Sequence, residues 1–175
     1  SSSKFEHLDF LAECKKIKKL DLSVSYSGSS YSNDKKLENI DFLSKLNNLE
    51  DLKLIGLDHY EFEDFNMDGL SSCKKIKKLT LSISEETATN LSLLKNYESL
   101  EILNLNGFSS FQVSGKISDI EGLKGLSNLK SLSIDDFKFY GLDNGNLMTE
   151  LNTSINQSST NNAEQIRVSE RHLVV

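Results

Sequence analysis

The segment CKKIKKLTLSIS, residues 73–84, decides the fold, and CKKIKKLDLSVS, residues 14–25, nearly repeats it. Each segment has a cysteine, an isoleucine three residues later, a leucine three residues after that, and a second leucine two residues further on. The spacing of two places both leucines on one side of a short strand, and the spacings of three place apolar residues on one side of a helix or 3-10 coil. Internal duplication of one structural unit is the simplest explanation.

The same spacing occurs in five copies along the chain. Counted from an anchor residue, each copy has apolar residues at positions −9, −6, −3, 0, +3 and +5. All thirty tested positions are apolar, although apolar residues make up 37% of the chain. One unit cannot cover its own leucines, so we expect stacked units that share a core and a parallel sheet. The anchors are Ile17, Leu49, Ile76, Leu100 and Leu129.

Composition excludes several classes of protein. The chain has 175 residues, a formal net charge of −6 and two cysteines. Two cysteines cannot build a disulfide framework, and there is no apolar run of about 18 residues that would cross a membrane. No signal peptide is visible in the printed sequence, and the acidic balance disfavours nucleic acid and anionic membranes as partners.

The repeat resembles the leucine-rich repeat, and the resemblance covers roughly residues 5–140. It implies an α/β fold: a right-handed solenoid, or horseshoe, of about five repeats with a parallel concave sheet and a helical or 3-10 convex side. Residues 5–14 and 85–97 are long enough for true helices. We assign residues 1–143 to the repeat domain and residues 144–175 to an Asn/Ser-rich tail or the start of further sequence.

Two kinds of leucine-rich repeat compete. LAECKKIKKLDLS (residues 11–23) and LSSCKKIKKLTLS (residues 70–82) look like the cysteine-containing repeats of F-box leucine-rich substrate receptors, and outer helices would fit that kind. ISDIEGLKGLSNLKSLSI (residues 117–134) looks more like bacterial internalins or the leucine-rich regulatory subunit of protein phosphatase 1.

Both resemblances imply a protein–protein interaction scaffold that binds another protein and is not an enzyme. The first hypothesis is the substrate-recognition part of an F-box-like ubiquitin ligase receptor, or a regulatory subunit, in the cytoplasm or nucleus. The alternative is an extracellular adhesion or receptor ectodomain of internalin type. The oligomeric state stays open.

We expect no reactive site among the cysteines and histidines. Cys14 and Cys73 lie two repeats apart, and a strand spacing of about 4.8 Å then puts them beyond the ~7 Å Cα limit of a disulfide. We expect both to be buried thiols in leucine positions. His7, His59 and His172 have neither metal-ligand spacing nor a nucleophile beside them, so we expect no catalytic residue, cofactor or metal.

Charged residues beside the anchors alternate in sign. We expect neighbouring strands to pair these opposite charges. On the strands themselves we expect two further pairs, Lys19 with Asp51 and Asp21 with Lys53. Exposed pairs contribute about 0–1 kcal/mol each, so such a ladder would set the order of repeats more than their stability. The residue after the anchor is, in order, Lys18, Glu50, Lys77, Glu101 and Lys130.

Strand residues that face away from the core would line the concave surface and bind a partner. Ile55 and Ile102 are its apolar members and could form a hot spot. The acidic, aromatic segment 56–69 is a second candidate, because loops between repeats often carry function. The candidate residues for partner binding are Asp51, Lys53, Ile55, Thr80, Ile102, Asn104, His59 and Tyr60.

Overall fold

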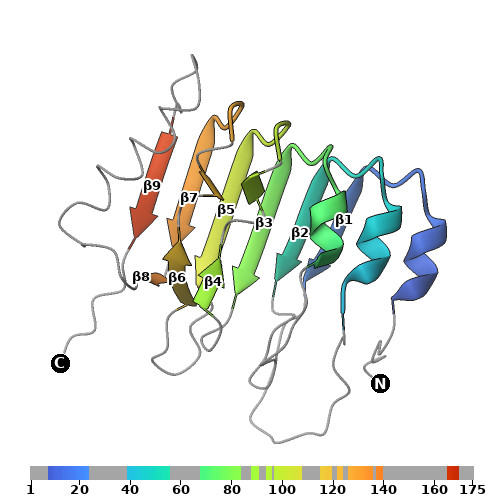
Figure 1. The fold of residues 1–175 in the computed structure, drawn as a ribbon, viewed down its shortest axis with the longest axis horizontal. Coiled ribbons are helices and arrows are strands. Elements are labelled where there is room, and N and C mark those ends of the chain that lie inside the picture. Colours follow the sequence, from blue (N-terminus) through green and yellow to red (C-terminus); the bar gives the residue numbers. More distant parts are fainter. Residues whose placement is uncertain are drawn as a thin grey trace, which may run out of the picture.

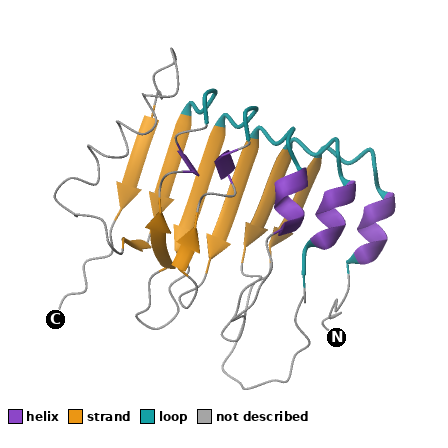
Figure 2. Ribbon diagram, viewed as in Figure 1, coloured by secondary structure: helices purple, strands orange, loops and turns teal. Residues whose placement is uncertain are grey.

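A computed structural model of the chain describes residues 8–23, 39–55, 68–83, 88–90, 94–95, 97–107, 115–119, 122–123, 126–135, 137–139 and 165–169. Over these residues the chain folds into stacked repeats with two parallel sheets and short helices on one side of the larger sheet (Figure 1, Figure 2). The larger sheet, which we call the main sheet, positions the candidate functional site.

The main sheet has six parallel strands in the order β1-β2-β3-β5-β7-β9. Its register pairs Leu20 with Leu52, Leu52 with Leu79, Leu79 with Leu103 and Leu103 with Leu132. The repeat alignment read from the sequence is therefore confirmed for the first five strands. The strands are β1 (Lys19–Ser23), β2 (Asp51–Ile55), β3 (Lys78–Ile83), β5 (Ile102–Gly107), β7 (Ser131–Asp135) and β9 (Gln165–Ser169).

The repeat leucines form one continuous core. From the second repeat to the fifth, every pattern residue whose side chain is described is buried, including Leu52, Leu79, Leu103 and Leu132. Strand burial alternates with a period of two, as in β2, β5 and β7. Each strand thus gives one half of its residues to the core and leaves the other half on the opposite side of the sheet.

Three 3-10 helices lie side by side against the main sheet: η1 (Asp9–Glu13), η2 (Asp41–Lys45) and η3 (Asp68–Ser72) (Figure 2). Their hydrogen bonds join successive apolar positions of the repeat: Leu43 N donates to Ile40 O over 3.0 Å, and Leu46 N donates to Leu43 O over 2.9 Å. A strict spacing of three matches the 3.0 residues per turn of a 3-10 helix better than the 3.6 of an α-helix.

The expectation of true helices over residues 5–14 and 85–97 is therefore wrong in the described part of both segments. The first holds only the five residues of the 3-10 helix η1, and the second holds the strand β4 (Ala88–Asn90). β4 pairs in parallel with β6 (Gly115–Asp119), and β6 pairs with β8 (Phe137–Phe139). This three-stranded sheet joins the segments between repeats and has no counterpart in the sequence-based expectations.

Strand β9 lies within residues 144–175, the segment assigned to a tail or to further sequence. It extends the main sheet by placing Ile166 opposite Leu132 and Val168 opposite Ile134. The two-residue step of the repeat is thus present, but three of the four earlier positions are polar. The residues at those earlier positions are Ala163, Thr160, Gln157 and Ser154.

The two cysteines occupy equivalent positions in the repeat but different environments. Cys73 is buried, and its thiol donates to Leu43 O over 3.2 Å, a carbonyl of the preceding repeat. Tyr97 stands at the same position one repeat later, and its hydroxyl donates to the equivalent carbonyl, that of Leu70. Cys14 is exposed, which contradicts the expectation of two buried thiols. It belongs to the first repeat, and no described residue stacks on the outer side of that repeat.

We predict that the two thiols react at very different rates. Burial removes access to Cys73 and raises the pKa of its thiol to about 11, and the thiolate is the reactive form. A water-soluble maleimide or disulfide reagent should therefore modify one thiol per chain in the folded protein and two after denaturation. Cys14→Ser should abolish the folded-state reaction, whereas Cys73→Ser should leave it unchanged. Equal rates for the two thiols in the folded protein would contradict the structure.

Candidate functional site: the outer face of the main sheet

The strand residues that do not enter the core form a continuous surface, which we call the outer face. It extends across five neighbouring strands, and strand pairing brings its residues into rows that run from repeat to repeat. All six of the expected partner-binding residues that lie on strands belong to these rows. The outer face consists of Lys19, Asp21, Ser23, Asp51, Lys53, Ile55, Lys78, Thr80, Ser82, Ile102, Asn104, Asn106, Ser131, Ser133 and Asp135.

The outer face is charged over β1 and β2, and the charges pair across the strands. Lys19 Nζ lies 3.1 Å from Asp51 Oδ2, and Lys53 Nζ lies 3.2 Å from Asp21 Oδ2. The hydroxyl of Ser23 also donates to Asp21, and this bond together with Lys53 holds the pKa of the Asp21 carboxyl below its usual value. Both expected charge pairs between β1 and β2 are confirmed, and they leave little net charge on this part of the surface.

Over β3, β5 and β7 the outer face carries mainly hydroxyl and amide groups. Asn104 Nδ2 donates to Thr80 Oγ1 over 3.2 Å, and Ser133 Oγ donates to Asp135 Oδ2 over 2.8 Å. Thr80 is only 9% exposed because its short side chain stands between the longer side chains of Lys53 and Asn104 in the same row. It therefore presents little surface to a partner, and Asn104 presents more.

Ile55 and Ile102 stand in different rows of the outer face. Ile102 pairs with Lys78 in the row of Asp51, whereas Ile55 ends β2 four residues further along. Two strand spacings of about 4.8 Å and four residues at about 3.3 Å each separate them by roughly 16 Å. His59 and Tyr60, the other expected contacts, lie outside the described residues.

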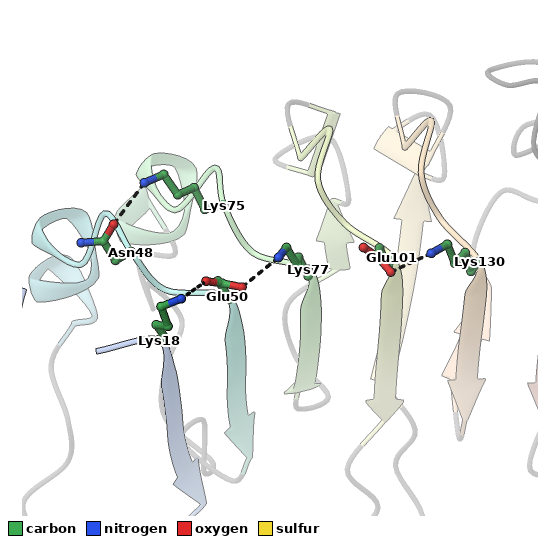
Figure 3. A network of polar contacts seen from close by, with 7 residues as sticks. All are labelled: Lys18, Asn48, Glu50, Lys75, Lys77, Glu101 and Lys130. Atoms are coloured by element: carbon green, nitrogen blue, oxygen red, sulfur yellow. Dashed lines mark hydrogen bonds and ion pairs between the residues drawn. The ribbon is translucent and has the colours of Figure 1, made fainter. Parts of the chain in front are cut away.

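A second set of charges lies where the chain enters the strands, beside the outer face (Figure 3). Glu50 lies 2.9 Å from Lys18 on one side and 2.9 Å from Lys77 on the other, and Glu101 lies 2.9 Å from Lys130. The two lysines lower the pKa of Glu50 to about 2, and Glu50 in turn raises the pKa of Lys77. The alternating ladder expected from the sequence is confirmed at these three contacts.

Two asparagines also join neighbouring repeats, and the sequence-based reasoning did not single them out. Asn48 Nδ2 donates to Lys15 O over 3.0 Å, and Asn128 Nδ2 donates to Glu98 O over 2.6 Å. Lys75 Nζ extends the first contact by donating to Asn48 Oδ1 over 3.1 Å (Figure 3). Both asparagines directly precede an anchor leucine, and this shared position is the signal that could have identified them.

The chemistry that the described residues offer is hydrogen bonding and charge pairing. Among them, no three His, Cys, Asp or Glu side chains are grouped so that they could hold a metal ion. The helices that the structure describes are all too short and too polar to cross a membrane. The outer face can thus contact a surface that offers hydrogen-bond donors and acceptors over several strands.

No protein-family model and no curated protein matches the sequence. Solved structures do match. An internalin C2 of Listeria monocytogenes is 19% identical over 95% of the chain, with a TM-score of 0.51. A second internalin of that bacterium, InlF, is 18% identical over 94% of the chain, with a TM-score of 0.57. The chain spans only 57% and 37% of these two proteins. At such identities the likeness concerns the fold alone, and it agrees with the register and core described above: this chain has the fold of a leucine-rich repeat solenoid.

Proposed function

We propose that the chain is a protein-binding scaffold that holds its partner on the outer face of the main sheet. The carrying observation is that five strands in register present their non-core residues as one surface, while the core needs only the alternate residues. A protein partner suits this surface because it is broad and its hydroxyl and amide groups are distributed over several strands.

Two features of the outer face would give such a partner its specificity. The charged part over β1 and β2 is neutralised by its own pairs, so a partner must match the positions of the charges and not merely an overall sign. The hydroxyl and amide part requires partner groups that complete its hydrogen bonds, because polar groups buried without partners are costly.

Of the two kinds of scaffold considered, the described helices and the matched structures fit the internalin type of repeat better, and we propose no location for the chain. Outer helices were one of the features that favoured an F-box-like substrate receptor, and the described part of the chain has 3-10 helices and a strand in their place. The matched structures are internalins. The repeated cysteine at positions 14 and 73 still favours the F-box-like hypothesis.

The test is a quantitative capture experiment with a charge-reversed outer face. Asp51→Lys combined with Lys53→Asp keeps the net charge and inverts both charges at the centre of the charged part. Proteins that the wild-type chain captures from a cell lysate or from culture medium should bind the double variant at least tenfold more weakly, since correctly placed charges become repulsive. Captured proteins are identified by mass spectrometry, and each affinity is then measured with purified partner.

The matched control is Asp41→Lys combined with Lys45→Asp, which makes the same exchange on the exposed side of η2. Both double variants must keep the wild-type circular dichroism spectrum, and the outer-face variant should lower the denaturation midpoint only slightly, because the exposed pairs it breaks, Lys19–Asp51 and Asp21–Lys53, contribute about 0–1 kcal/mol each. Binding that survives inversion of the outer face, or that is lost equally in the control, would contradict the proposal. Asn106→Arg, in the hydroxyl and amide part, shows whether the partner also covers β5.

A further inference from the structure

Six exposed lysines lie at the end of the main sheet where its strands begin, in the segments that lead from a 3-10 helix to a strand (Figure 2). They come from the nearly identical segments of the first and third repeats, residues 14–19 and 73–78. In the third repeat the buried residues Cys73 and Ile76 flank two of these lysines, so the core holds the turn while the lysines stay outside. We call the six lysines the basic rim: Lys15, Lys16, Lys18, Lys74, Lys75 and Lys77.

The charge ladder at the strand entrances neutralises only part of the basic rim. Glu50, in the second repeat, lies 2.9 Å from Lys18 and 2.9 Å from Lys77, so one carboxylate serves both lysines (Figure 3). Lys75 donates to the neutral side-chain amide of Asn48 over 3.1 Å. Within the described part of the chain, Glu50 is the only carboxylate in ion-pair contact with the six lysines. The rim therefore keeps positive charge, although the whole chain carries a net charge of −6.

Lys15, Lys16 and Lys74 are the least neutralised members of the basic rim. Each is exposed, and none of them forms an ion pair with a carboxylate of the described residues. The charge changes sign at the fourth repeat, where the exposed Glu98 occupies the position that Lys74 has in the third. An extended polyanion such as a nucleic acid would meet like charge beyond the third repeat, so the rim suits a short anionic segment better.

Hydrogen bonds join the turns of the first three repeats. Asn48 Nδ2 donates to Lys15 O over 3.0 Å, and the contact between Lys75 and Asn48 continues this connection to the third turn. Equivalent lysines of the first and third turns are two strand spacings apart, roughly 10 Å. In a peptide of polyproline II conformation, residues three apart lie on the same side at a separation of about 9 Å. Two carboxylates of one peptide can therefore reach both lysine turns at once.

Asn47 lies between the two lysine turns and favours a peptide over other anions. It is exposed, and its side chain makes no hydrogen bond to another residue that the structure describes, unlike that of Asn48. A side-chain amide has both donors and an acceptor, and the backbone of a bound peptide offers a C=O and an N–H that match them. A phosphodiester or sulfate ester only accepts hydrogen bonds, so it would leave the amide oxygen of Asn47 without a partner.

We propose that the basic rim binds an acidic peptide segment of another protein, which lies across the first three repeats with its carboxylates on the two lysine turns and its backbone against Asn47. Each lysine is a flexible point charge with three donors, so the rim selects carboxylates by their spacing more than by one exact geometry. The rim shares no residue with the outer face. Binding at the rim and binding at the outer face can therefore be tested, and can fail, independently.

Fluorescence anisotropy with labelled peptides on the purified 175-residue chain tests the proposal. At an ionic strength of about 0.1 M the Debye length of about 10 Å screens the distant acids of the chain but not lysines in contact with the peptide. Hexaglutamate should then bind about tenfold more tightly than hexaglutamine, and about 1 M salt should remove the difference. Hexathymidylate should bind more weakly than hexaglutamate. Equal affinities for the two peptides would overturn the proposal, and so would an oligonucleotide that binds as tightly as hexaglutamate or more tightly.

A double variant, Lys15→Ser with Lys74→Ser, removes one unpaired lysine from each turn and leaves the contacts of Glu50 in place. The fifth repeat already has a serine, Ser127, at the equivalent position, so the variant should keep the wild-type circular dichroism spectrum. Its affinity for hexaglutamate should fall about tenfold, since two charge contacts are lost.

The matched control is Lys45→Ser with Lys95→Ser, which removes two exposed lysines outside the basic rim and makes the same change in net charge. Because neither lysine lies in the turns that the peptide covers, the affinity of this variant for hexaglutamate should stay within about twofold of the wild type. Wild-type affinity in the rim variant, or equal losses in the rim variant and the control, would show that the peptide does not bind at the rim.

Discussion

Leu79→Ala is expected to lower the free energy of unfolding by about 2–5 kcal/mol, the range for truncating a leucine in a packed core. Leu79 is 0% exposed and lies on β3, with Leu52 of β2 and Leu103 of β5 as its partners in the register. The neighbouring repeats fix the positions of the surrounding backbone on both sides. The cavity left by the leucine therefore cannot collapse easily, and the cost should lie in the upper part of the range.

The measurement is urea denaturation followed by circular dichroism, with Lys78→Ala as the control. Lys78 precedes Leu79 on the same strand but is exposed, so its truncation should leave the midpoint nearly unchanged. Contacts in a solenoid join only neighbouring repeats, so the loss at β3 should weaken both of its junctions and broaden the transition. An unchanged midpoint for Leu79→Ala would show that Leu79 does not lie in the core and that the register is wrong.

The register of the main sheet could be predicted because, in every repeat, a three-residue spacing of apolar residues is followed at the same point by a two-residue spacing. The step from Leu79 to Leu81 identifies one side of a strand, and the three-residue steps before it identify the segment that packs behind that strand. Once the strands are aligned on their anchors, the partners of a charged residue follow directly. The contact between Glu50 and Lys77, at 2.9 Å, is an example.

Other parts of the fold could not be predicted because the sequence carries no periodicity that specifies them. β4, with the sequence Ala-Thr-Asn, is too short to show alternation, and its pairing with β6 depends on how the repeats stack. β9 keeps the two-residue step of Ile166 and Val168 but has polar residues at three of the four earlier positions, so a test of the whole repeat rejects it. Cys14 matches Cys73 in sequence, and only its place in the first repeat makes it exposed.

The candidate site was predicted at the level of positions and less well at the level of contacts. The sequence places Thr80, Asn104 and Ile102 on the outer side of their strands, and the register agrees. It also places Ile55 and Ile102 in different rows, because they lie six and two residues after their anchors. It does not show that Asn104 donates to Thr80, because that contact depends on the rotamers of two side chains on neighbouring strands.

The close approach of η2 and η3 gives the second large prediction. Gly69 lies in η3, and a Cβ atom added there would overlap the carbonyl oxygen of Ile40 and lie 2.8 Å from its carbonyl carbon. Gly69→Ala should therefore destabilise the chain by about 3 kcal/mol, the upper part of the usual range for overpacking, because backbone atoms cannot move aside as a flexible side chain can. The effect is measured as the shift in the urea midpoint.

Two further variants separate this steric cause from a general effect of substitution in η3. Ser72→Ala changes an exposed residue of the same helix and should shift the midpoint little. Ile40→Ala in the Gly69→Ala background should give no rescue, because the overlap involves the backbone of Ile40, and loss of its buried side chain adds a cavity. If Gly69→Ala were neutral, or if Ile40→Ala restored stability, the backbones of η2 and η3 would not approach each other closely enough to exclude a Cβ atom at position 69. The absence of a side chain at position 69 would then need a different explanation from the spacing between repeats.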